Sequence, residues 1–195
     1  MMNIEDIAEK FKNLYAKMKT DTFLSRSSLG GEIPFWISPY NPEQELEVSK
    51  SIKGLKNKLE NDGLIILDLN LFDVSMELLQ EHLGEGEIFE LEQQMDKDEL
   101  KEAIQSVLDI NEVFMPELKK RIDESQAHVY FITGVGTCYP FLRSHNVLNN
   151  LQNIAKEAPT VMFFPGKYNG KSLELFGLLK DDNYYRAFNI DNYKI

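Results

Sequence analysis

The chain has 195 residues, of which 43% are hydrophobic and 27% are charged, and these values predict one globular domain with its own core. Its single cysteine, Cys138, excludes an intramolecular disulfide and fits a reducing compartment. The sequence has no run of about 18 apolar residues and lacks the basic-then-apolar start of a signal peptide, so we expect a cytoplasmic protein without a membrane span.

The net charge of −11 is unevenly distributed along the chain. Residues 1–127 carry 14 basic and 27 acidic side chains, a net charge of −13, whereas residues 128–190 carry 6 basic and 4 acidic ones, a net charge of +2. Residues 81–127 alone have a net charge of −9. An acidic protein repels nucleic acid at long range, so direct nucleic-acid binding is not expected. An anionic ligand would bind most readily in the mildly basic last third.

The first part of the chain predicts two helices and two strands. Apolar residues at three- and four-residue spacing predict an amphipathic helix over residues 3–19, with Asn3 as its N-cap. The aromatic segment 33–38 predicts a short strand, which the proline after it ends. Residues 64–69 are apolar on both faces, which predicts a central parallel strand. Between the strands a helix is expected over 42–60, with an inward face of Leu46, Ile52, Leu55 and Leu59.

Strand-like and helix-like segments continue to alternate in the rest of the chain. Residues 73–83 predict a helix, and the acidic segment 81–127 predicts a helical insertion of two helices, at 88–108 and 111–125. Beyond it we expect strands at 128–133, 159–164 and 186–190, and helices at 146–156 and 172–180. This alternation predicts a single α/β domain over residues 1–195, with a mainly parallel sheet of four or five strands, helices on both faces, and residues 128–190 as its C-terminal core.

The loop after the strand at 159–164 resembles part of a P-loop, in which glycine amides wrap a phosphate and a lysine reaches its oxygens. Gly170, Lys171 and Ser172 match the end of that pattern, between an expected strand and an expected helix. Its first glycine is replaced by Pro165, which has no N–H to donate. The alternative interpretation is a tight turn before a helix whose N-cap is Ser172.

A second glycine turn follows Thr133, at the end of another expected strand. Gly134 and Gly136 resemble a dinucleotide-binding turn, but its third glycine is missing and Pro140 stands where a helix should begin. Backbone amides at this turn could still hold a phosphate or a carboxylate. The pattern therefore keeps these residues as ligand candidates without predicting a dinucleotide site.

Three adjacent residues, Arg143, Ser144 and His145, combine a cation, a hydroxyl and a base. Side chains that are neighbours in sequence point apart, so they rarely act as a nucleophile and its base. We expect Ser144 or His145 to cap the helix that follows, and Arg143 to pair with an acid.

Metal-binding and base-stacking sites have little support in the sequence. The three histidines and the cysteine are far apart, with no pair at metal-ligand spacing. Asp181 and Asp182 could bind a hard cation but are expected to form a turn. Tyr185 and Arg186, with the aromatic residues around them, could stack bases, yet no basic run accompanies them, and packing of the last strand is favoured. No metal ion or cofactor is therefore expected.

Several longer strings resemble the BrxB family, and together they run nearly end to end. They are Phe131-Ile-Thr-Gly-Val-Gly136, Tyr139-Pro-Phe-Leu-Arg-Ser-His145 and Lys180-Asp-Asp-Asn-Tyr-Tyr-Arg-Ala-Phe188, with shorter strings at 30–35, 67–73, 148–151 and 163–166. The resemblance implies a small cytoplasmic subunit of BREX, a bacterial anti-phage system that methylates host DNA and blocks phage replication. Other BREX proteins include an adenine methyltransferase, a large ATPase and a phosphatase-like protein called PglZ. The family implies a system and a set of partners, but no catalytic residues.

Two hypotheses about function follow. The first is a non-catalytic interaction subunit that binds other BREX proteins, with PglZ foremost among them. The second is a nucleotide- or nucleic-acid-dependent enzyme that uses the glycine loops at 134–136 and 165–172. The acidic charge and the lack of a catalytic constellation favour the first. The interaction or ligand candidates are Thr133, Gly134, Gly136, Arg143, Ser144, His145, Asn149, Lys171, Asp182, Tyr185 and Arg186, and none is assigned a catalytic or metal-binding role.

Overall fold

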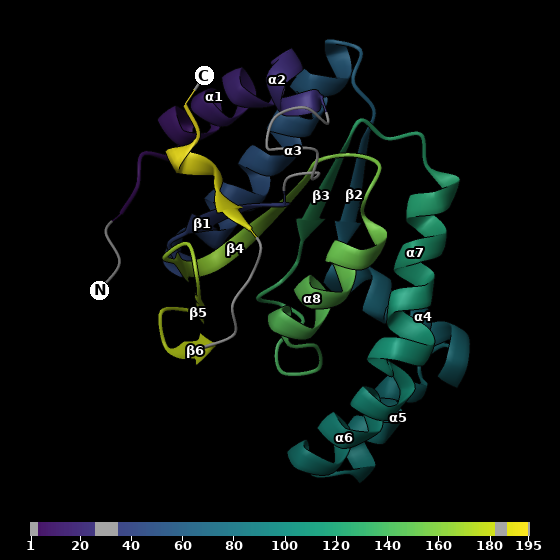
Figure 1. Cartoon of the computed structure of the whole chain (residues 1–195). Helices are drawn as coiled ribbons and strands as arrows, with labels where there is room; N and C mark the ends of the chain where they lie inside the picture. The colour runs from purple at the N-terminus through teal and green to yellow at the C-terminus, as the bar shows by residue number, and fades with distance from the viewer. Residues whose placement is uncertain (1–3, 26–34, 182–186, 195) are drawn as a thin grey trace.

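The computed structural model describes residues 4–25, 35–181 and 187–194, and it confirms the predicted α/β fold with a mainly parallel sheet flanked by helices (Figure 1). Parallel strands follow one another in the order β2-β3-β4-β1-β7. Their bounds are β1 Phe35–Tyr40, β2 Ile66–Asn70, β3 Val129–Thr133, β4 Thr160–Tyr168 and β7 Phe188–Asn189. Two short antiparallel strands, β5 (Leu173–Leu175) and β6 (Leu179–Asp181), extend from the end of β4.

Helices cover both faces of this sheet and bury a separate core on each. One face is covered by α1 (Ile7–Met18), α2 (Asp21–Leu24) and α3 (Glu45–Asn61), and the other by α4 (Leu71–Leu83), α7 (Met115–Glu124) and α8 (Ser144–Ile154). On the first face Phe163 stacks on Phe11, with ring centroids 6.0 Å apart, and meets the edge of Phe131 at 5.2 Å. Alternate residues of β3 and β4 therefore point to opposite cores, as a strand requires when both its faces are covered.

The acidic segment 81–127 contains three α-helices instead of the predicted two. α5 (Glu87–Gln94) ends at Met95, and Asp96 then starts α6 (Lys97–Val107) through a capping box with Glu99. α5 has no buried residue and α6 has only Ile104, and Figure 1 shows the pair projecting from one end of the domain. After a short π-helical turn, α7 packs into the main core through Met115, Leu118 and Ile122. Within the described ranges, every helix is too short or too polar to cross a bilayer.

The prediction that Pro39 ends the first strand is wrong, because β1 runs through it to Tyr40. Pro39 pairs in register with Phe164 of β4, and its carbonyl accepts a hydrogen bond from Lys10 Nζ at 2.7 Å. Contacts with other elements therefore keep the proline in the strand.

β2 is the edge strand of the parallel sheet, and the prediction of a central strand at 64–69 is wrong. Its apolar sequence has another cause, since both of its faces are covered although one edge is open. Ile66 belongs to the core under α1 and α3, and Leu69 belongs to the core under α4 and α8. Burial of the two faces, which the apolar run does report, does not determine the position of a strand in the sheet.

The predicted helix over residues 172–180 is also wrong, because this segment forms the β5–β6 hairpin. Its turn contains Phe176 and Gly177, which have φ angles of 56° and 68° and so end any helical path. The backbone N–H of Phe176 donates to the carbonyl of Pro165 at 2.8 Å, which ties the turn to β4. Leu173 and Leu175 alternate with partly exposed residues and are buried.

The sequence prediction was also wrong about one of the residues on the inward face of α3 (Glu45–Asn61). Leu46 is 80% exposed, and Val48 takes the inward position together with Ile52, Leu55 and Leu59. Each helical residue advances about 100°, so a residue two positions before Val48 lies on the opposite side of the helix. Leu46 is thus an isolated apolar side chain on the surface.

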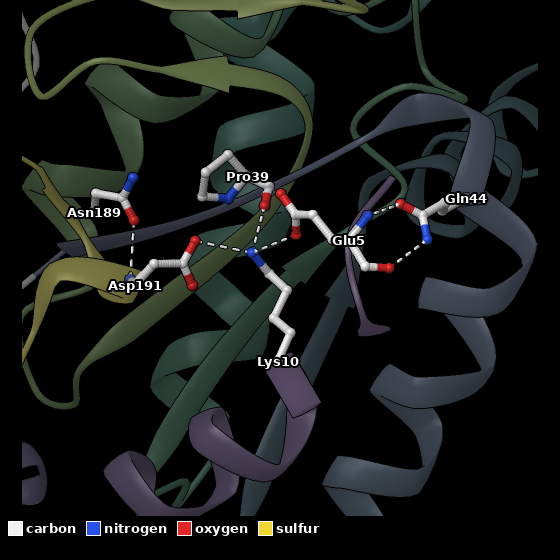
Figure 2. A network of polar contacts seen from close by, with 6 residues as sticks. All are labelled: Glu5, Lys10, Pro39, Gln44, Asn189 and Asp191. Carbon is white, nitrogen blue, oxygen red and sulfur yellow. Dashed lines mark hydrogen bonds and ion pairs between the residues drawn. The ribbon is translucent and has the colours of Figure 1, made fainter. Parts of the chain in front are cut away.

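The first helix and the turn after β7 meet at the carboxyl end of β1. Asp6, and not Asn3, accepts from the N–H of Glu9 and caps α1, and Asn3 lies outside the described residues. The Lys10 ammonium, whose side chain is 9% exposed, donates to Pro39 O at 2.7 Å and Asp191 Oδ2 at 2.8 Å and lies 3.1 Å from Glu5 Oε2 (Figure 2). This network fastens the first helix to the last turn of the chain.

Candidate functional site

A hollow of about 410 Å³ opens between the start of α8 and the β5–β6 hairpin, which lie side by side in Figure 1. Both apolar and polar side chains form its wall. They are Tyr139, Arg143, Ser144 and His145 from the α8 side, and Leu175, Leu178, Leu179, Lys180 and Asp181 from the hairpin. The structure thus brings three of the sequence candidates, Arg143, Ser144 and His145, to one surface.

The loop between β3 and α8 folds back on itself and so delivers Tyr139 to the hollow. The N–H of Cys138 donates to the carbonyl of Gly134 at 3.1 Å, and the N–H of Leu142 donates to the carbonyl of Cys138 at 3.0 Å. Cys138 and Leu142 are buried, which anchors these turns in the core below. The Tyr139 ring meets the Phe176 ring edge-on, with centroids 6.1 Å apart, so the loop and the hairpin turn support each other.

Exposed apolar side chains form the rim of the hollow. Leu178 is 81% exposed, Leu179 is 41% exposed and Tyr139 is 38% exposed. Single exposed apolar residues are ordinary, but here three surround one depression. Such a grouping is typical of a surface that another molecule covers.

The charged groups of the hollow are arranged differently from the prediction. His145 Nδ1 lies 3.2 Å from Asp181 Oδ2, so His145 is the residue that contacts an acid. Neither Ser144 nor His145 caps α8. Arg143 occupies the N-cap position with extended backbone angles, and no side chain caps the helix. Arg143 is exposed and forms no ion pair with the acids that the structure describes.

The other sequence candidates do not line this hollow. Asn149 is exposed on α8 beyond its first turn, and Lys171 is exposed at the turn between β4 and β5. Asp182, Tyr185 and Arg186 lie outside the described residues.

Protein atoms lie directly against the glycine turn after β3. At Gly134, whose φ is +70°, an added Cβ would lie 2.1 Å from Asn70 Oδ1, the atom that accepts from the N–H of Phe72 and caps α4. At Gly136 it would lie 2.9 Å from the Pro165 ring. Close packing between β2, β3 and β4 thus accounts for both glycines.

The predicted loop at 165–172 consists of the end of β4 and the turn of the β4–β5 hairpin, and the helix that a P-loop needs does not follow it. Asn169 Oδ1 accepts from the backbone N–H groups of Lys171 at 2.9 Å and of Ser172 at 2.8 Å. The expectation that Ser172 caps a helix is therefore wrong, and the side chain of Asn169 organises the turn. These two N–H groups already have an acceptor within the protein.

The described residues offer neither a reactive thiol nor a cluster of metal-ligating side chains. Burial raises the pKa of the Cys138 thiol to about 12, against a lesser opposing effect of Ser75, so the thiol stays protonated at neutral pH. No three His, Cys, Asp or Glu side chains come together as a possible metal site in the part of the chain that the structure describes.

Thr133 pairs with an acid that the sequence candidates did not include. Its hydroxyl donates to Asp68 Oδ1 at 2.8 Å, across the carboxyl ends of β2 and β3. Burial raises the pKa of Asp68, and the Thr133 hydrogen bond opposes this shift. Asp68 therefore binds its proton more tightly in the folded protein than in the unfolded chain.

Asp68→Asn is expected to raise the free energy of unfolding slightly at pH 7, because the amide removes a partly buried charge and keeps an oxygen that Thr133 can contact. A group whose pKa is raised on folding costs stability when it ionises, so the wild-type protein loses stability as pH rises through that pKa. Urea unfolding of both proteins between pH 3.5 and 7 measures the effect. The advantage of the variant should shrink toward low pH, and an advantage that is constant with pH would contradict the assignment.

Sequence reasoning missed the whole apolar rim of the hollow. Leu178 and Leu179 were placed in a helix, where their spacing after Leu175 resembles one apolar stripe. A signal was present, because Leu173 and Leu175 alternate as in a strand and Gly177 follows as a turn residue. The segment is too short for periodicity alone to separate the two structures.

Comparison with known proteins gives a consistent family. A family model described as "BREX protein BrxB" matches residues 67–190. A BREX protein BrxB of Bacillus cereus (strain H3081.97) is 36% identical over 188 residues, which cover 94% of this chain and 97% of the relative. A BREX protein BrxB of Escherichia coli O9:H4 (strain HS) is 28% identical over 181 residues, covering 93% and 90%. No solved structure matches the chain.

These matches span the strands, the glycine turn, the start of α8 and the hairpin that build the hollow. They confirm the resemblance that the strings around Gly134, Arg143 and Lys180 indicate. The chain belongs to the BrxB family of the BREX system, which gives it a role in bacterial defence against phage.

Proposed function

We propose that the protein serves phage defence as a non-catalytic interaction subunit that binds another BREX protein through the hollow beside α8. The observation that carries this proposal is the grouping of Leu178, Leu179 and Tyr139 around a depression that also presents Arg143. Protein interfaces combine an apolar centre with aromatic and arginine side chains in this way. The PglZ-like phosphatase-superfamily protein is the partner to test first.

The size of the hollow fits an anchor site within a larger contact. Full burial of one leucine or phenylalanine side chain contributes about 1.5–3 kcal/mol, and a few such anchors dominate most interfaces. Leu178 is 81% exposed at the hairpin turn, so nearly its whole side chain is available to a partner.

The described residues supply no support for the alternative, an enzyme that uses the glycine loops. The turn at Gly134 packs against the α4 cap, and the loop at Lys171 belongs to a hairpin. The buried Cys138 stays protonated at neutral pH, which removes it as a nucleophile. A loss of ATP binding in Lys171→Ala would favour the enzyme, whereas the absence of any measurable heat of ATP or DNA binding by calorimetry would contradict it.

The test is affinity purification of the tagged protein from cells that express the complete BREX system, with mass spectrometry of the BREX subunits that accompany it. Leu178→Asp is expected to lose at least one BREX subunit and to raise phage plating to the level of cells without the system, because a charge replaces an apolar anchor. Leu46→Asp is the matched control. Leu46 is 80% exposed but lies on α3, outside the hollow, so this variant should keep both the subunit and defence.

Two outcomes would overturn the proposal. In one, Leu178→Asp retains every BREX subunit that wild type retains. In the other, both leucine variants lose the same subunit, which would point to a general effect of the charge. A circular dichroism melt of each purified variant establishes that it is folded.

A further inference from the structure

We infer that the hollow receives a protein segment in which an acidic side chain stands next to a bulky apolar one, the carboxylate contacting Arg143 and the apolar side chain lying against Leu178 and Leu179. This inference rests on the proposed function, since it names the chemistry of the partner at the same surface. Two kinds of observation, on charge and on shape, lead to it.

The charge of the hollow selects an anion. Arg143 is exposed at its edge, Lys180 also lines it, and the acid in the lining, Asp181, contacts His145. A guanidinium binds a carboxylate through two parallel hydrogen bonds, a geometry that a single ammonium cannot reproduce. The uncapped first turn of α8, beside Arg143, adds a smaller favourable field.

The acidic charge of the rest of the protein also favours a short acidic segment over a larger anion. Residues 1–127 carry a net charge of −13, so an acidic segment is repelled by most of the surface and attracted only near the basic last third. The same field repels a polynucleotide, whose many phosphates extend well beyond one hollow. A short segment with one or two acids gains the local contact and avoids most of the repulsion.

The shape of the hollow requires an apolar group beside the anion. Leu175 forms part of the wall, and Leu178, Leu179 and Tyr139 form the exposed rim. Its volume of about 410 Å³ lies within the range of about 300–1,000 Å³ typical of small-ligand sites. That space accommodates a few side chains of an inserted segment and excludes a folded domain. A free phosphate would leave the leucines uncovered.

The experiment uses overlapping 15-residue peptides that span the other BREX proteins of the same system, immobilised and probed with the full-length purified protein. We expect peptides that bind wild type and fail to bind Arg143→Glu, and these should contain Asp or Glu beside Leu, Ile, Met or Phe. Lys171→Glu is the charge-matched control, because Lys171 is exposed and lies outside the hollow. It should retain the same peptides.

Calorimetry with the strongest soluble peptide then tests the contact directly. Replacing its acid by the corresponding amide should weaken binding about tenfold or more, and replacing the acid by lysine should restore binding to Arg143→Glu. Retained peptides without an acid, an equal affinity of the acid and amide forms, or no retained peptide would each overturn the inference. So would Arg143-dependent binding of a 20-nucleotide single-stranded DNA or of inorganic phosphate.

Failure of this inference can be distinguished from failure of the proposed function. If Leu178→Asp loses a BREX subunit while the acid in the peptide proves irrelevant, the docking surface stands and the carboxylate assignment falls. If Leu178→Asp keeps every subunit, the docking surface itself is wrong.

Discussion

Gly134→Ala is expected to lower the free energy of unfolding by about 2–3 kcal/mol. Two separate effects add up in this estimate. A φ angle of +70° costs alanine about 1–2 kcal/mol relative to glycine. The new Cβ would lie 2.1 Å from Asn70 Oδ1, so the side chain that caps α4 must move, and loss of an N-cap costs about 1 kcal/mol. Urea unfolding gives the change from the midpoint if the slope is unchanged.

Gly63→Ala is the matched control for the backbone effect. Gly63 has a φ of +88°, and nothing lies within 4 Å of an added Cβ, so only the conformational cost of about 1–2 kcal/mol should appear. In the background of Asn70→Ala, the cost of Gly134→Ala should fall toward that of the control. If the costs of the Asn70 and Gly134 variants simply add, the clash with the cap is not the cause.

The result bears on function as well as on stability. A glycine that served a bound phosphate would face open space, and its replacement would alter binding more than folding. The contact with Asn70 instead predicts a protein that folds less stably and, under conditions where it is folded, retains every BREX subunit that co-purifies with wild type. The two interpretations of Gly134 thus differ in what the same variant changes.

Features that depend on local chain chemistry were predictable from the sequence. The amphipathic stripe of α1, the apolar runs of β3 and β4 and the turn at Gly63 follow from side-chain spacing and backbone freedom, and all are present. The polar cluster at Arg143–His145 could also be found, because it follows a strand and a glycine turn.

Features that depend on neighbours distant in sequence were not predictable. An apolar run reports that both faces of β2 are covered, and the same run would appear in the centre of a sheet. The hairpin at 172–180 is held by Pro165 and by the ring contact of Phe176 with Tyr139, and neither contact is visible in local periodicity. The apolar rim of the hollow went undetected for that reason.

Lys10→Met is expected to lower the free energy of unfolding by about 2 kcal/mol, although the shape of the side chain is nearly preserved. The change removes the cation between Glu5 and Asp191 and leaves the Pro39 carbonyl without its donor (Figure 2). The two carboxylates have exposed fractions of 36% and 38%, so water can reach them after the change. The cost is therefore below the 3–5 kcal/mol typical of breaking a fully buried pair.

Lys12→Met is the control, because Lys12 lies on the same helix with its side chain in solvent, and its removal should change stability by less than about 0.5 kcal/mol. Equal effects of the two variants would show that the network contributes nothing beyond helix propensity. Amide hydrogen exchange shows which part of the structure loses stability in Lys10→Met. Lys17 Nζ donates to the carbonyl of Ile190 at 2.7 Å, so α1 should still hold the last turn in part. Amide hydrogen exchange at Asp191 should accelerate in Lys10→Met more than exchange in β3, because the turn opens locally before the sheet unfolds.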